Sequence, residues 1–106
     1  MEKFRTECKD LVSKIDITVD LLVKQNMEEA IQELLNLIDN LTKVIDFLFL
    51  NKDELIKLGI VVDEKNMIEK LNEIVEALNN TDFVLVADLL NFEIKDIFTN
   101  YIEQLK

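Results

Sequence analysis

The chain contains no proline and a single glycine, Gly59, among its 106 residues. Proline and glycine supply most of the tight turns that join β-strands, because proline fixes φ and glycine adopts positive φ. A chain almost without them has few positions at which hairpins form. The sequence therefore favours helices joined by short polar connections and disfavours a β-rich fold.

Apolar residues repeat with helical spacing in the second quarter of the chain. They recur at alternating intervals of four and three, which places them on one face of a helix. That face comprises Met27, Ile31, Leu34, Ile38, Leu41, Ile45 and Leu48. It is widened by Ala30, Leu35, Leu37 and Val44. A face this broad requires at least two packing neighbours, as in the core of a helical bundle.

A similar stripe in the first segment predicts a reversal of the chain. The stripe contains Phe4, Cys8, Leu11, Ile15 and Leu22, with Thr18 in the remaining position. Its continuation falls on Gln25 and Glu29, whereas the next stripe restarts at Met27. Two residues correspond to about 200° of helical rotation, so one straight helix would have apolar halves on opposite sides. We expect a turn at Gln25 and Asn26, with Asn26 as the N-cap of the second helix and Glu29 completing a capping-box-like pair.

Further boundaries follow in the second half of the chain. Residues 52–58 either continue the second helix or form a short extra helix, and both alternatives end at Gly59, which suits a left-handed C-terminal position. Asp63 is expected to cap a third helix. Its inward residues are expected to be Met67, Leu71, Ile74 and Leu78, with Ile68 and Val75 beside them.

The last helix is expected to begin after Thr81 or Asp82. Its inward set is Phe83, Val86, Ala87, Leu90, Ile94, Ile97, Phe98, Tyr101 and Leu105. Four principal helices with short connections predict an all-α fold, most simply an antiparallel up-down four-helix bundle with an extra short helix around residues 52–58. No repeat or linker divides the sequence, so we expect one domain over residues 1–106.

Charge and composition exclude several classes of partner and setting. Twelve basic against twenty-two acidic residues give a net charge of −10, which argues against nucleic acid and anionic membranes as partners. No apolar run approaches the ~20 residues of a membrane span, and the N-terminal residues do not resemble a secretory signal. A single cysteine, Cys8, cannot form an intramolecular disulfide. We therefore expect a soluble protein in the reducing cytoplasm.

The sequence offers little chemistry for catalysis or metal binding. Without histidine it lacks the commonest general base and metal ligand, and phosphate-binding and calcium-binding loops need glycines that it does not have. Cys8 lies on an apolar stripe and is interpreted as a small buried side chain. Glu93 is expected at the flank of the apolar face, extended to solvent or paired with a lysine. We predict no catalytic residue, no cofactor and no metal site, and expect a non-enzymatic protein.

Apolar residues outside the core stripes are the only positive functional signal. Leu85, Leu89 and Phe92 form a second stripe on the last helix, and Phe47 and Leu50 point away from the main face of the second. Apolar side chains of this kind are expected to be buried against another apolar surface. That surface belongs either to the interior of the same chain, to a second copy of it, or to an amphipathic helix of a partner.

The last helix also carries a resemblance to known sequences. The segment NNTDFVLVADLLNFEIKDIFTNYIEQL resembles the C-terminal part of small uncharacterised helical proteins of low-GC Gram-positive bacteria, with an ADLLxxE core. That core is Ala87, Asp88, Leu89, Leu90 and Glu93. The resemblance implies an all-helical protein and supplies no activity or site residues. An acidic bundle of this length is also similar in character to flagellar and secretion export chaperones, which hold helical cargo segments.

The leading hypothesis is an adaptor or chaperone-like module that binds a partner helix or another copy of itself. The expected contact residues are Leu85, Leu89, Phe92, Phe47 and Leu50. The alternative from another class is a small enzyme or ligand-binding domain that uses Asp88, Glu93 or Tyr101 in a bundle cavity. A third hypothesis is a purely structural domain.

Overall fold

The computed structural model describes residues 1–105, and these form helices and no strand. The elements are α1 (Glu2–Val23), α2 (Met27–Leu50), α3 (Lys52–Lys57), α4 (Glu64–Asn79), α5 (Phe83–Asp88), the π-helix η1 (Leu89–Ile94) and α6 (Lys95–Gln104). The backbone stays helical from α5 through η1 to α6, so these three form one long helix, called here the last helix. The all-α prediction is confirmed, and the short extra helix is present as α3.

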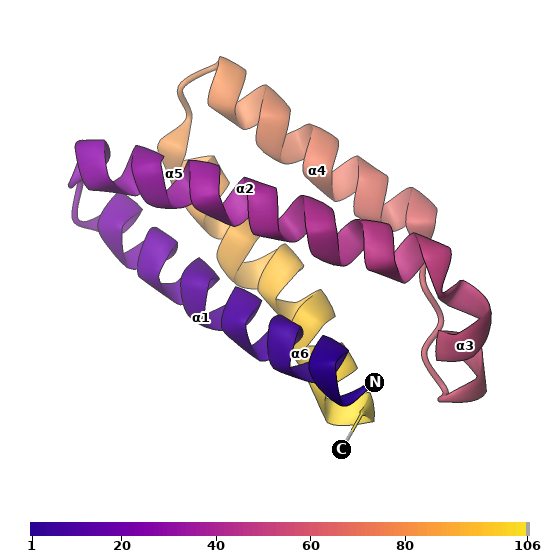
Figure 1. Ribbon diagram of the computed structural model, residues 1–106. Coiled ribbons are helices and arrows are strands. Elements are labelled where there is room, and N and C mark those ends of the chain that lie inside the picture. Colours follow the sequence, from indigo (N-terminus) through magenta and orange to yellow (C-terminus); the bar gives the residue numbers. More distant parts are fainter. Residues whose placement is uncertain (106) are drawn as a thin grey trace.

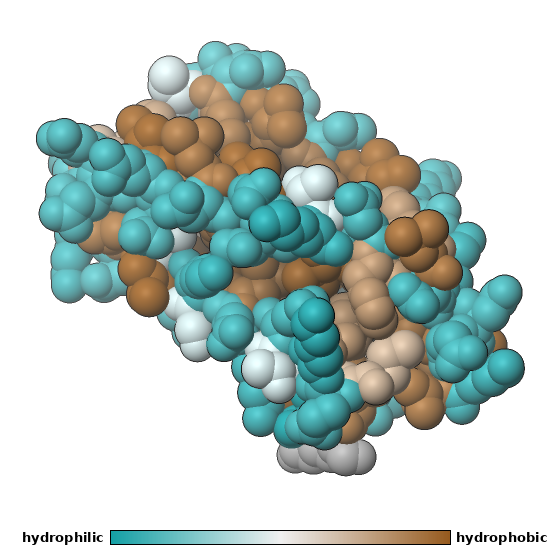
Figure 2. Space-filling view, in the orientation of Figure 1, coloured by the Kyte–Doolittle hydropathy of each residue, from teal (hydrophilic) through white to brown (hydrophobic). Residues whose placement is uncertain are grey.

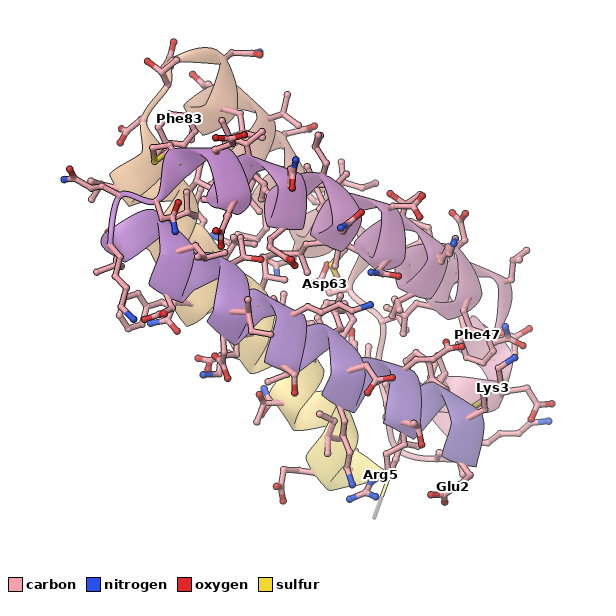
Figure 3. The ribbon with its side chains drawn as sticks, turned by 60° about the vertical axis from the view of Figure 1, so that its left-hand side comes forward. Glu2, Lys3, Arg5, Phe47, Asp63 and Phe83 are labelled. Carbon is pink, nitrogen blue, oxygen red and sulfur yellow. The ribbon has the colours of Figure 1, made fainter. Side chains whose placement is uncertain are left out.

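The helices form a bundle with one open side. In Figure 1, α1 and α2 lie next to each other and run in opposite directions, and α6 ends where α1 begins. Arg5 Nε on α1 donates a hydrogen bond to the carbonyl oxygen of Ile102 on α6 at 3.2 Å, and Figure 3 shows Arg5 beside the end of α6. α4 packs on α5 and η1 but hardly on α2. The order in space is therefore α2, α1, last helix, α4.

Three helices end in the same left-handed turn. In each, one residue has positive φ and the next backbone N–H donates to a carbonyl oxygen five residues back, at 2.8 to 3.0 Å. The left-handed residues are Gln25 (φ 59°), Gly59 (φ 85°) and Thr81 (φ 51°). The predicted turn at Gln25 and Asn26 and the predicted helix end at Gly59 are confirmed.

Aspartate side chains cap two of the helices. The carboxylate of Asp63 accepts a hydrogen bond from the Asn66 N–H at 3.0 Å, and that of Asp82 accepts one from the Leu85 N–H at 3.1 Å. Asn26 precedes α2 as predicted, but its side chain makes no capping hydrogen bond. The expected capping-box pair is therefore wrong, because the turn that ends α1 sets the conformation of Asn26.

Replacing Thr81 by glycine is expected to stabilise the protein by about 1 kcal/mol. A left-handed conformation costs a residue with a side chain ~1–2 kcal/mol, part of which is offset by the greater freedom of glycine in the unfolded chain. Urea denaturation measures the difference. Asn80→Gly, one residue earlier at φ −90°, should instead lower the stability. A Thr81→Gly variant no more stable than the original chain would contradict the prediction.

Most of the residues predicted to point inward are buried, and Cys8 is among them. Aromatic rings pack at the end of the bundle where α1 begins. The ring of Phe98 meets that of Tyr101 edge-on with centroids 5.7 Å apart, and Phe4 stacks on Phe47 at 4.8 Å. The centroid of the Phe4 ring also lies 6.4 Å from that of Tyr101, so these rings join α1, α2 and α6 in one core.

Five residues predicted for the core or its border are exposed. They are Ile31, Leu35 and Ile38 on α2 and Ile68 and Val75 on α4. The prediction is wrong for them because α2 and α4 hardly pack on each other, so side chains that face this gap keep contact with water. These five residues therefore lie at the open side of the bundle.

Candidate functional site

The structure does not gather the five predicted contact residues into one surface. Leu50 is 85% exposed, Phe92 64% and Leu85 42%, whereas Leu89 is only 8% exposed. The prediction that Leu89 is a surface contact is therefore wrong. Leu89 belongs to η1, which is central in the bundle because it packs on both α1 and α4.

The π-helix also separates Phe92 from the stripe to which it was assigned. A turn closed by i→i+5 hydrogen bonds contains more residues than an α-turn, so a residue three positions after Leu89 no longer lies directly above it. Phe92 consequently faces solvent while Leu89 and Leu90 are buried. The second apolar stripe of the last helix is thus partly internal core.

The two predicted patches also lie far apart. Phe47 is half-buried and stacks on Phe4 at the start of α1. Figure 3 shows Phe47 and Phe83 at opposite ends of the molecule, and Leu85 is two residues from Phe83. The patch on the last helix and the patch at the end of α2 are therefore two separate surfaces.

The polar residues of the alternative hypothesis do not converge. Glu93 forms an ion pair with Lys70 of α4, with Nζ and Oε2 3.6 Å apart, so its expected pairing with a lysine is confirmed. Asp88 lines an open hollow between the α1–α2 turn and the start of α5. Tyr101 lines a different hollow beside α6. These three side chains do not form one catalytic centre.

An apolar groove lies on the open side of the bundle, between α2 and α4. Its volume is about 250 Å³, and Leu90 of the last helix lies between the two walls. The wall of α2 is formed by Leu34, Leu37, Ile38, Leu41, Thr42, Ile45 and Asp46. The wall of α4 is formed by Leu71, Ile74, Val75 and Leu78. Within the described part of the chain, Thr42 and Asp46 are the only polar lining residues. We call this feature the α2–α4 groove.

Exposed aliphatic side chains extend the groove on both sides. Ile31 and Leu35 continue its apolar character along α2, and Ile68 does so along α4. Figure 2 shows brown, hydrophobic surface between teal stretches in this part of the molecule. Apolar patches with polar margins are typical of sites that bind other proteins.

The two helices that form the groove are acidic. Together α2 and α4 contain nine acidic and three basic side chains, a formal charge of −6, whereas α1 has five and four, a charge of −1. Two of the three lysines are already paired: Lys43 with Asp39 at 3.3 Å and Lys70 with Glu73 at 3.6 Å. The groove is therefore an apolar channel between two helices of net negative charge, and Asp46 is the acidic residue in its lining.

Within residues 1–105, no group of three or more cysteine or acidic side chains is placed to hold a metal ion. No helix in this part of the chain combines the length and apolar character needed to cross a membrane.

A family model described as a domain of unknown function, DUF8042, matches residues 1–104. The chain belongs to the DUF8042 family. No curated protein and no solved structure matches it. The function of this DUF8042 protein therefore has to be inferred from the site itself.

Sequence reasoning missed the groove in this DUF8042 protein although one signal was present. The apolar face of α2 is broad enough to require two neighbours, and α1 supplies only one of them. Ile38 on α2 and Val75 on α4 follow the same helical spacing as their buried neighbours. The helical spacing identifies the apolar faces of α2 and α4, but it does not show that the two faces fail to pack on each other.

Proposed function

We propose that this protein is a non-enzymatic interaction module, adaptor-like or chaperone-like, that binds an amphipathic helix of a partner protein in the α2–α4 groove. The observation that carries the proposal is the apolar, open channel between two helices that hardly touch. Helix-in-groove recognition uses such channels, with anchors spaced three and four residues apart. The docked helix would supply the neighbour that α2 lacks.

The charges of the groove point to a cationic partner. Glu28, Glu29 and Glu33 on α2 and Glu76 on α4 form no ion pair with any of residues 1–105. Lysine or arginine residues beside the apolar face of a partner helix would be attracted by this uncompensated negative charge. A second copy of this chain would instead bring two acidic surfaces together, which disfavours self-association through the groove. The proposal also places the protein in a reducing cytoplasm, supported by its lone Cys8.

The proposal is tested with a designed peptide. An amphipathic helical peptide with leucines on one face and lysines beside them should bind, as measured by fluorescence anisotropy, and the same peptide with glutamates for lysines should bind at least about tenfold more weakly. Val75→Asp places a charge in the groove and should weaken binding of the lysine peptide by about tenfold or more. Val75 is 54% exposed, so the fold should tolerate this change.

Leu50→Asp is the matched control, because Leu50 is exposed and lies outside the groove. It should leave the affinity unchanged. Equal weakening by Leu50→Asp and Val75→Asp, or equal binding of the two peptides, would refute the proposal. Light scattering adds a separate test: a monomer is expected, and a dimer dissociated by Val75→Asp would assign the groove to self-association instead.

A further inference from the structure

A second, more polar hollow lies between the α3–α4 connection and α6, with a volume of about 250 Å³. It shares no lining residue with the α2–α4 groove. Its polar side chains are Asp63, Asn66, Asn100, Tyr101 and Gln104. Apolar residues, among them Ile60, Met67 and Ile97, complete the lining. We call this feature the polar hollow.

The hydroxyl group of Tyr101 opens into the polar hollow. Tyr101 is 8% exposed, and its ring is held against Phe98 and Phe4. The hydroxyl makes no hydrogen bond with residues 1–105, yet no fully buried side-chain nitrogen or oxygen in this part of the chain lacks a partner. Its oxygen must therefore reach open space, and the polar hollow is the space that Tyr101 lines. A buried aromatic side chain thus presents an unused polar group there.

The state of this hydroxyl follows from its surroundings. Burial, followed by the nearby Cys8 and Asp63, raises the pKa of Tyr101 above its ordinary value. The hydroxyl consequently stays protonated at neutral pH and acts as both a donor and an acceptor. Among residues 1–105, Asp63 is the only charged residue of the lining.

Several other hydrogen-bonding groups of the polar hollow are unused within residues 1–105. Asp63 accepts the Asn66 N–H through Oδ1, and its Oδ2 atom has no hydrogen-bond or ion-pair partner among residues 1–105. The side-chain amides of Asn66, Asn100 and Gln104 make no hydrogen bond there either. The side chain of Gln104 reaches the Gly59 edge of the hollow, since its Oε1 atom lies 3.7 Å from the position that a Cβ atom on Gly59 would occupy. The hollow therefore combines one negative charge with free amide oxygens.

We propose that the polar hollow binds a small organic cation with a short alkyl chain, an alkylammonium. An ammonium group has three donors and no acceptor, so it matches the Asp63 carboxylate and the neighbouring amide oxygens. Its methylene groups would lie against Ile60, Met67 and Ile97. An anion is disfavoured, because Asp63 already occupies the N-terminus of α4 and would repel it. This site is independent of the proposed helix-binding groove.

The test uses butylamine, with butanol as a neutral probe of similar shape. NMR titration at neutral pH should give saturable shifts of the Asn66, Asn100 and Gln104 side-chain amides with butylamine but not with butanol. Asp63→Asn should weaken binding by about tenfold or more, since it removes the charge but keeps an equally good N-cap. Tyr101→Phe should also weaken it, because it removes only the hydroxyl.

Asp82→Asn is the matched control, because Asp82 caps α5 as Asp63 caps α4 but lies outside the polar hollow. It should leave the affinity for butylamine unchanged. Equal weakening by Asp82→Asn and Asp63→Asn would show nonspecific attraction to an acidic protein and overturn the proposal. Equal binding of butanol, or no saturable shift of the three amides in the folded original chain, would overturn it as well.

Discussion

Replacing Phe98 by alanine is expected to lower the free energy of unfolding by about 3–5 kcal/mol. Phe98 is completely buried and packs edge-on against Tyr101, so the shortened side chain leaves a cavity where α1 meets α6. Domains of this size are stable by only ~5–15 kcal/mol, so the loss is a large part of the total. Urea denaturation followed by circular dichroism measures it.

Phe92→Ala on the same helix is the matched control for this experiment. Phe92 is largely exposed, so its loss should change the free energy of unfolding by less than about 0.5 kcal/mol. Similar effects of Phe92→Ala and Phe98→Ala would contradict the packing of the last helix described above.

Cys8 is expected to react with iodoacetamide about 1,000-fold more slowly in the folded protein than in the unfolded chain. Burial, followed by the nearby Glu7 carboxylate, raises the pKa of the Cys8 thiol from 9.0 to about 12. The thiolate is the reactive form, and each pKa unit lowers its fraction about tenfold at mildly alkaline pH. Mass spectrometry of the alkylated protein gives both rates, because the chain contains no other cysteine.

The same shift has a consequence for stability. Above pH 9 the thiol ionises in the unfolded chain while it stays protonated in the folded one, so the contribution of Cys8 to the free energy of unfolding decreases between pH 9 and about 12.

A Cys8→Ser variant is the control for the alkylation experiment, because it should not be alkylated at this position and so identifies the signal. Folded and unfolded chains that react within tenfold of each other would contradict the burial of the thiol.

The helices and their ends could be predicted from the sequence because they depend on local features. The four-and-three spacing identifies the faces of α1, α2 and α4, and Gly59 and Asp63 mark boundaries by their own conformational and hydrogen-bonding properties. Each of these signals lies within a few residues of the feature that it predicts. These signals can therefore be recognised without knowledge of the tertiary arrangement.

The sites could not be predicted, because they depend on how separate helices meet. Val75 has the same spacing as a core residue, and only the gap beside α2 makes it a margin of the groove. Leu89 was misplaced because it is buried only by the packing of its helix on both α1 and α4, which no local pattern indicates. Asp63 and Tyr101 are distant in the sequence and meet only when the connection before α4 lies along α6.

Because one side of the bundle is open, the helices differ in the free-energy cost of separating them from the rest of the fold. α1 packs on both α2 and the last helix, whereas the packing of α4 depends on α5 and η1. Segments with fewer buried contacts separate from a fold at a lower free-energy cost than its centre does. α4 then moves outward more readily than α1 does, and the width of the groove adjusts to side chains of different size while the α1–α2–α6 core stays intact.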